Sequence, residues 1–303
     1  AIAKHALSYG LLPMLAKTLL LEYMIIRDLN VPQTYSLGKR VIEYSEFLCR
    51  EDRLEAHYRV GVHAHLLEQY RDSQQILQPV IEDKKLDEGR LKEKALHAIY
   101  NNMIELKQYQ EAEMYLEQYA TEFNKQDNSY YLVDKARILA ATGKVTEAIP
   151  VLKDHLKKNE MNNATLHAVL ELIKIYLRIG RYSDAIKLSA THEQNLSRIV
   201  ETDSLRGPFN KLRFGIYLRW MGKVYYADQD YNMTTEYYLK SLEVFADLKL
   251  KKEFLETEKE LFGLNEGIGF WFENISEQPT LLGRSAQKRI AELLDKLHES
   301  IIL

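Results

Sequence analysis

The chain has 303 residues, 46% of them hydrophobic, with only 13 Gly and 6 Pro. This composition supplies a core and is too poor in Gly and Pro for a loop-rich β protein or a disordered chain. The formal net charge of −3 excludes the broad basic surface of a chain that grips nucleic acid by itself. We therefore expect a helical protein without direct nucleic-acid binding.

The single cysteine, Cys49, excludes an internal disulfide or a multi-cysteine metal site and is typical of a reducing compartment. We expect its thiol to be buried and inert. The longest apolar run near the N-terminus, residues 19–26, is interrupted by Glu22 and is far shorter than the ~20 residues of a membrane span. The sequence thus predicts a cytoplasmic chain with no membrane contact. It begins at Ala1, directly in helical sequence, which indicates a processed or trimmed N-terminus.

Residues 1–53 predict a degenerate N-terminal helical repeat. Two amphipathic segments, residues 15–29 and 36–49, are its expected helices, and residues 30–32 form the expected turn around a proline. Degeneracy is typical of the end unit of a repeat array.

Between residues 54 and 249 one pattern recurs five times: a turn, a mostly aromatic residue, and a small residue three positions later. The aromatic or apolar position is Tyr70, Tyr109, Val145, Tyr182 and Tyr231, so successive spacings are 39, 36, 37 and 49 residues. These exceed the 34 residues of a minimal tetratricopeptide unit, which indicates longer helices and loops.

The pattern assigns small residues to the points where paired helices cross. They are Ser73, Ala112, Ala148, Ala185 and Thr234 on the second helices, opposite Gly61, Tyr100, Ala136, Ile173 and Gly222 on the first. Small side chains let helix axes approach to about 8 Å. A plain helical bundle would not repeat this signature. The sequence therefore predicts an all-α, tetratricopeptide-like right-handed superhelix of antiparallel helix pairs.

Residues 250–303 are expected to be C-terminal capping helices, over 250–261 and 285–302. Three glycines and a proline mark a break between them, at Gly263, Gly267, Gly269 and Pro279. The apolar cluster at residues 270–272 is expected to pack against the last repeat. The last helix carries an apolar seam that predicts a homodimer, made of Ile290, Leu293, Leu294, Leu297 and Ile301.

No catalytic motif is present, neither a phosphate loop nor a nucleophile elbow nor a dinucleotide fingerprint. Of the densest histidine group, His57 and His63 point to different faces of a helix, which argues against a metal site. We expect neither an enzyme nor a cofactor.

The register of the repeats predicts which side chains of the first helices face a common concave surface. The predicted peptide-binding positions are Asn101, Arg137, Lys174 and Lys223, with Tyr58, His97 and Arg219 one turn earlier and Tyr226 near one end. A carboxamide can satisfy both groups of a peptide backbone, and the cations can take a C-terminal carboxylate or acidic side chains. The alternative is that these long cations merely solvate the inner face.

The repeats resemble tetratricopeptide proteins over about residues 54–245, with the closest local match at residues 180–186. The long spacing and the wealth of tyrosine resemble, more narrowly, bacterial quorum-sensing receptors of the Rap, NprR, PlcR and Rgg type. This resemblance implies that a short signalling peptide binds inside the superhelix, and that asparagines of the concave helices hold the backbone of this peptide. Asn101 matches such a position. It also implies a transcription regulator, here without its helix-turn-helix domain.

Two functions follow as hypotheses. The first is the peptide-binding regulatory domain of an intracellular signalling-peptide receptor, with a short peptide as its partner. The alternative is a general tetratricopeptide scaffold for protein–protein interaction.

Overall fold

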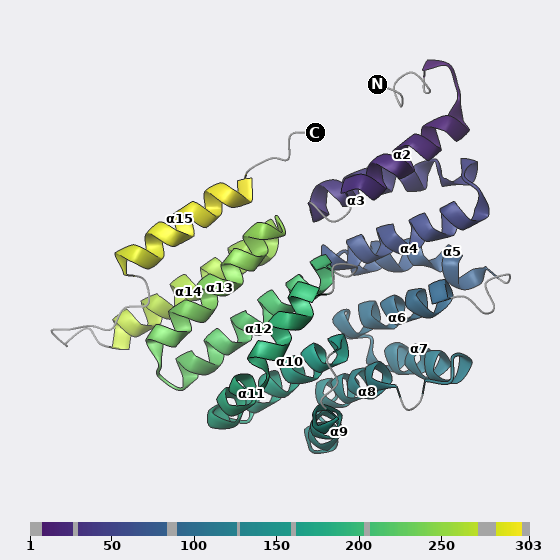
Figure 1. The fold of residues 1–303 in the computed structure, drawn as a ribbon. Helices are drawn as coiled ribbons and strands as arrows, with labels where there is room; N and C mark the ends of the chain where they lie inside the picture. The colour runs from purple at the N-terminus through teal and green to yellow at the C-terminus, as the bar shows by residue number, and fades with distance from the viewer. Residues whose placement is uncertain are drawn as a thin grey trace. The chain divides into compact units, whose positions relative to one another are not determined.

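The structure is a computed structural model that describes residues 8–26, 30–83, 90–125, 128–158, 162–202, 207–271 and 283–298. In these ranges the chain forms fourteen α-helices, one short 3-10 helix and no strand, which confirms the all-α prediction (Figure 1). None of the helices in the described ranges has the length and apolar character that a membrane crossing requires. The chain divides into two compact units, residues 1–143 and 144–303.

The first unit consists of helices that each pack on their neighbours along the chain, in the order α2 to α8. Their bounds are α2 Leu12–Ile26, α3 Val31–Glu43, the 3-10 helix Ser45–Phe47, α4 Arg50–Leu66, α5 Tyr70–Glu82, α6 Arg90–Glu105, α7 Tyr109–Glu122 and α8 Ser129–Ala141. The first helices of successive pairs also touch, since α4 contacts α6.

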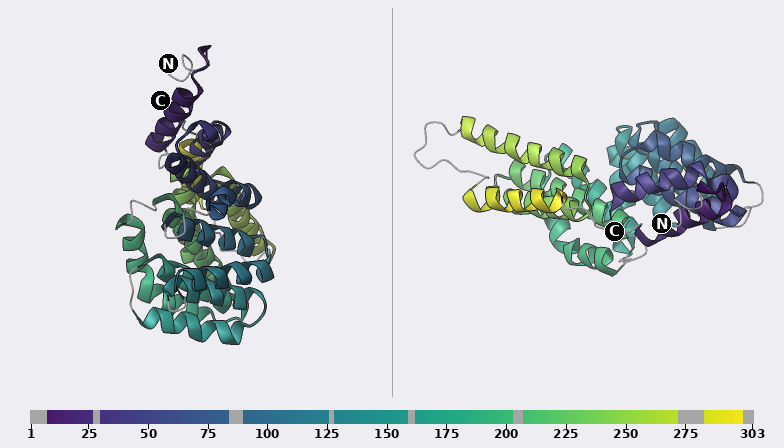
Figure 2. Two further views of the ribbon diagram at one scale, coloured as in Figure 1. Left: turned by 90° about the vertical axis from the view of Figure 1, so that its right-hand side faces the viewer. Right: turned by 90° about the horizontal axis from the view of Figure 1, so that it is seen from above.

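The second unit repeats this arrangement and ends with an added helix. Its helices are α9 Val145–Lys157, α10 Asn163–Arg178, α11 Tyr182–Thr202, α12 Gly207–Ala227, α13 Tyr231–Asp247, α14 Lys251–Trp271 and α15 Arg284–His298. Here α10 contacts α12, and α13 packs against both α14 and α15 (Figure 2).

The five repeated turns share one backbone geometry. Each second helix begins at the residue taken as equivalent in the sequence, from Tyr70 to Tyr231. Two positions before it stands a residue with positive φ: Glu68, Lys107, Gly143, Gly180 and Gln229, with φ between 57° and 89°. Gly143 and Gly180 adopt this left-handed conformation without steric cost, whereas Glu68, Lys107 and Gln229 adopt it at some cost. At each of these three, the N–H of the next residue donates a hydrogen bond back to a backbone oxygen of the first helix.

The small crossing positions are all fully buried. Ser73 also donates a hydrogen bond of 2.7 Å from Oγ to the backbone oxygen of Gly61, across the α4–α5 crossing. A Cβ at Gly61 would lie 2.6 Å from Leu77 Cγ, and one at Gly222 would lie 2.5 Å from the Tyr238 ring. The absence of a side chain at these two glycines is what lets the paired helices approach so closely.

The expected N-terminal boundaries are wrong by several residues. The first helix, α2, begins at Leu12, and residues 27–29 lie outside the described ranges. The expected turn is in fact the start of α3: Asn30 accepts a hydrogen bond from the Gln33 N–H, and Pro32 lies in the first turn, where its missing N–H costs nothing. The helix ends at Glu43 rather than Cys49, and Cys49 is exposed, not buried, at the N-terminus of α4.

The C-terminal break is also placed wrongly. Helix α14 continues through Gly263, Gly267 and Gly269 to Trp271, since isolated glycines weaken a helix by only about 1 kcal/mol each. Pro279 and the side chains of the 270–272 cluster lie outside the described residues.

The apolar seam predicted to form a dimer is largely covered within the chain. The side chains of Ile290, Leu293 and Leu297 are buried in α15, which packs on α13, and Leu294 is half-buried. Ile301 lies outside the described residues. This seam therefore offers little surface to a second copy.

Glycine-to-alanine changes at Gly222 and Gly263 should have opposite effects on the free energy of unfolding, because only Gly222 lies where two helices approach closely. Gly222→Ala should lower the free energy of unfolding by about 1–3 kcal/mol, because the new methyl group collides with the Tyr238 ring. Gly263→Ala, in α14 with no heavy atom within 4 Å of its Cβ, should raise it by about 0.5–1 kcal/mol. Urea unfolding monitored by circular dichroism measures both. Equal effects would show that α12 and α13 do not cross at Gly222.

Candidate functional site

Asn101 and Arg137, two of the predicted peptide-binding residues, contact each other in the first unit. Arg137 Nη1 on α8 donates a 2.6 Å hydrogen bond to Asn101 Oδ1 on α6. The Asn101 amide donates in turn to the backbone oxygen of His97, at 2.9 Å. The side chains are only 2% and 4% exposed. The two residues therefore lie side by side, and both are buried.

Arg137 is also paired with carboxylates of its own unit. Its Nη1 lies 2.7 Å from Asp134 and its Nη2 lies 3.1 Å from Glu105. Asp134 accepts a further hydrogen bond of 2.9 Å from the Tyr100 hydroxyl. Burial, together with the Asp134 charge, raises the pKa of Tyr100 well above its ordinary value, so this hydroxyl stays a donor. The Arg137 network thus joins α6 to α8, and a ligand carboxylate would have to displace internal partners.

His97 and Tyr58 lie in aromatic surroundings of the same unit. The His97 ring makes edge contacts with Tyr100, Tyr119 and Tyr130, at centroid distances of 5.1, 6.2 and 5.6 Å, and its Nε2 is 3.5 Å from Asp134. The Tyr58 ring is covered by the Lys94 ammonium at 5.8 Å. Both residues pack within the first unit, and both keep part of their surface exposed.

The predicted cations of the second unit converge on an indole. The Lys223 ammonium lies 4.5 Å from the centroid of Trp220, and the Lys174 ammonium, from the preceding first helix, lies 5.8 Å from it. Each lysine has a carboxylate partner, since Lys174 pairs with Glu171 at 2.9 Å and Lys223 with Glu260 on α14 at 2.6 Å. We call Lys174, Trp220 and Lys223 the cation–indole cluster.

The other two predicted residues of this unit lie along α12 on either side of Lys223. Arg219 Nη1 lies 3.4 Å from Thr257 Oγ1 and 3.9 Å from Glu256, while its buried Nε has no hydrogen-bond partner. The Tyr226 ring packs against Tyr231 of α13 at 6.0 Å. The Arg219 guanidinium on α12 is therefore held only by long contacts.

Trp220 was missed by the sequence analysis, which considered only the predicted inward positions of each first helix. Trp220 directly follows Arg219 and lies one turn before Lys223, so its ring can contact both neighbouring lysines. As one of only two tryptophans in the chain, flanked by cations at helical spacing, it could have been singled out.

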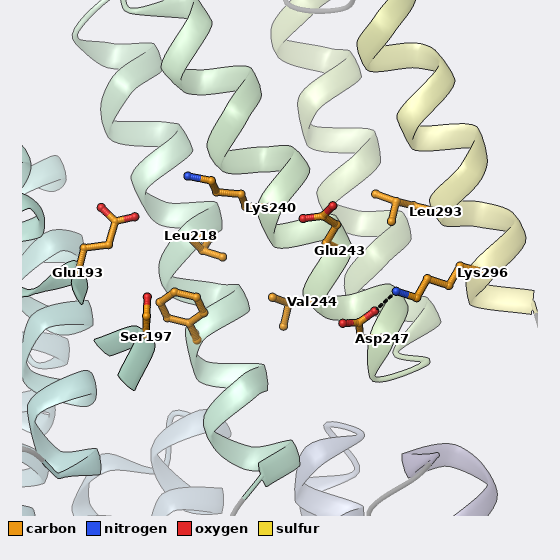
Figure 3. A pocket seen from close by; sticks show the side chains of 10 residues that line it. Glu193, Ser197, Leu218, Lys240, Glu243, Val244, Asp247, Leu293 and Lys296 are labelled. Atoms are coloured by element: carbon orange, nitrogen blue, oxygen red, sulfur yellow. Dashed lines mark ion pairs between the residues drawn. The ribbon is translucent and has the colours of Figure 1, made fainter. Parts of the chain in front are cut away.

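A hollow of about 490 Å³ lies elsewhere in the second unit, between α11, α12, α13 and α15 (Figure 3). Its carboxylates have partners within the chain: Glu193 accepts from Tyr237 at 2.7 Å, Glu243 pairs with Arg289 at 2.5 Å, and Asp247 pairs with Lys296. None of these groups is arranged as a nucleophile with a base, so the hollow suggests no catalytic chemistry.

The three histidines of α4 each have a different partner. His63 Nδ1 lies 2.8 Å from the Tyr23 hydroxyl, His65 Nδ1 lies 2.6 Å from Asn102 Oδ1, and His57 Nδ1 lies 2.8 Å from the Ile76 backbone oxygen. Within the described ranges, no group of three or more His, Cys, Asp or Glu side chains is placed to hold a metal ion. These histidines connect helices to one another.

No protein-family model matches the sequence, and no curated protein matches it either. What the fold shows is an all-α protein of packed helix pairs, and the site must be interpreted from its own geometry.

Two ion pairs with the same i,i+3 spacing, one buried and one exposed, should differ widely in how much they contribute to the free energy of unfolding. Arg137→Ala should lower the free energy of unfolding by about 3–5 kcal/mol, because it leaves Asp134 buried without its cation. Arg181→Ala removes an exposed pair with Asp184 and should cost about 1 kcal/mol or less. Urea unfolding measures both. Similar losses would contradict a buried, internally paired Arg137.

Buried His57 predicts that stability depends on pH. Burial lowers its pKa below the ordinary value of 6.5, so the unfolded chain binds this proton more readily than the folded chain. The contribution is fully present above pH 6.5 and is lost as the pH falls below it. In urea unfolding at a series of pH values, His57→Gln should weaken this loss of stability toward acid pH. An unchanged slope would argue against a buried, neutral His57.

Proposed function

We propose that the chain is a peptide-binding regulatory module, built of tetratricopeptide-like repeats, whose ligand lies on the cation–indole cluster. The observation that carries the proposal is the convergence of Lys174 and Lys223, from successive first helices, on the ring of Trp220, which is half-buried. A surface shared by successive first helices is where an extended peptide can contact several repeats at once. The regulatory, cytoplasmic signalling role rests on the resemblance to quorum-sensing receptors.

The proposed peptide site lies on the lysines of the second unit and leaves out Asn101 and Arg137, which the sequence had also placed in it. Asn101 and Arg137 are engaged inside the first unit, so we assign them to holding α6 and α8 together. The lysines of the second unit keep 20% and 27% of their side-chain surface exposed, and their carboxylate partners are themselves partly exposed. These pairs are less buried than the Arg137–Asp134 pair, so a peptide carboxylate can compete with Glu171 and Glu260 for the two lysines.

The chemistry of the cluster favours a peptide that offers both a carboxylate and an apolar side chain. Lys223 and Lys174 attract the negative charge, and Arg219, whose side chain is 19% exposed, adds a guanidinium. The face of Trp220 accepts an apolar or aromatic side chain or a peptide plane. An acidic residue or a C-terminal carboxylate next to an apolar residue combines these features.

Calorimetric titration with a library of short peptides tests the proposal. A peptide that binds should lose about tenfold in affinity with Lys223→Ala, and amidation of its C-terminus or neutralisation of its acid should have a similar effect. Lys288→Ala is the matched control, because Lys288 also pairs with a glutamate but is 79% exposed on α15. Binding that is equally sensitive to both lysines, or insensitive to both, would rule out the cluster as the peptide site.

A further inference from the structure

Helix α2 has two apolar faces, and only one of them is covered. Its buried face includes Leu15, Leu19, Tyr23 and Ile26, and the helix packs against α3. The opposite face is exposed, and it carries Met14, Leu21 and Ile25, which are 44%, 55% and 73% exposed. Leu11, which directly precedes the helix, is 43% exposed. Helices that are apolar all round are normally buried on all sides. The exposed face of α2 therefore indicates a binding surface.

The exposed residues follow the spacing of a coiled-coil seam. Residues 11, 14, 18, 21 and 25 are separated alternately by three and four positions, with Thr18 at the centre as the one polar member. This alternation keeps side chains in line along a partner helix that crosses at a shallow angle. We call residues 11, 14, 18, 21 and 25 the α2 stripe. We propose that the α2 stripe pairs in parallel with the α2 stripe of a second copy of this chain.

Two observations favour a second copy as the occupant. In the heptad set by the α2 stripe, Lys17 and Glu22 flank it on opposite sides, and both are exposed. The Lys17 ammonium also pairs with Asp52 of its own chain at 2.5 Å, an exposed ion pair that Glu22 of a second copy would join or replace. In a parallel pair of identical helices, these positions bring Lys17 of one copy next to Glu22 of the other, twice by symmetry. In addition, Ile25, which is β-branched, stands at position a of this heptad, and Leu21 stands at position d. This combination favours a parallel coiled coil of two helices.

The size of the α2 stripe predicts a weak dimer. It covers 14 intervals of about 1.5 Å, so it is roughly 21 Å long. A stripe of five side chains of this length buries less than the roughly 800 Å² per partner of a standard interface, which involves about 20–30 residues a side. Thr18 at the centre weakens it further. We expect a dissociation constant on the order of 10 µM, so the chain changes from monomer to dimer as its concentration rises. This inference does not depend on the proposed peptide site.

Sedimentation equilibrium of the full chain, from well below to well above about 10 µM, tests the pairing. The wild type should change from monomer to dimer, and Ile25→Glu should raise the dissociation constant at least about tenfold, because it places two carboxylates in the seam. Met114→Glu is the matched control, since Met114 is 65% exposed on α7, and it should behave as the wild type. A wild type that stays monomeric, or a dimer that tolerates Ile25→Glu, overturns the proposal.

The orientation and the occupant are tested separately. With Cys49→Ala as background, Ile25→Cys should give a covalent dimer on oxidation, because a parallel seam places the two copies of this position together. Linkage that forms only between Met14→Cys on one copy and Ile25→Cys on the other overturns the parallel arrangement. A monomeric chain that floats with phosphatidylcholine vesicles, and no longer does so with Ile25→Glu, assigns the α2 stripe to a lipid surface and overturns the pairing of copies.

Discussion

The close crossing of paired helices determines what every other side chain of a repeat can contact. Where Gly61 meets Leu77 and Gly222 meets Tyr238, the missing Cβ lets one helix lie directly on the next. In each of the five repeats the second helix starts two positions after a residue with left-handed backbone conformation. Because crossing and turn are fixed, the face that each first helix presents is fixed too.

That face is used differently in the two units. In the first unit it carries a guanidinium and a carboxylate that are almost fully buried and paired with each other, Arg137 and Asp134. Removing one partner of such a pair is costly, which suits a role in holding helices together. In the second unit the equivalent positions carry lysines whose ammonium groups lie beside an indole and whose partners are partly exposed. These ion pairs are more exposed than the Arg137–Asp134 pair, which is why we propose the peptide site here.

The sequence was sufficient for the helical class and for the five turns that precede the second helices, because these depend on local turn residues and on periodicity. It was insufficient where a proline or a glycine is compatible with two different local structures. Pro32 can end a helix or begin one, and the cap from Asn30 decides for the beginning. The glycines of α14 can break a helix or be tolerated in it. The buried pairing of Arg137 with Asp134 depends on tertiary packing, which spacing alone does not report.

The claim that a peptide lies on the cation–indole cluster is tested most directly by the indole N–H signals of a ¹⁵N-labelled chain. The chain has two tryptophans, Trp220 and Trp271, so Trp271→Phe assigns the two signals. During titration with a peptide that binds by calorimetry, the Trp220 signal should shift along the binding curve, with the same dissociation constant. A peptide that saturates the chain while the Trp220 signal stays in place would contradict the site.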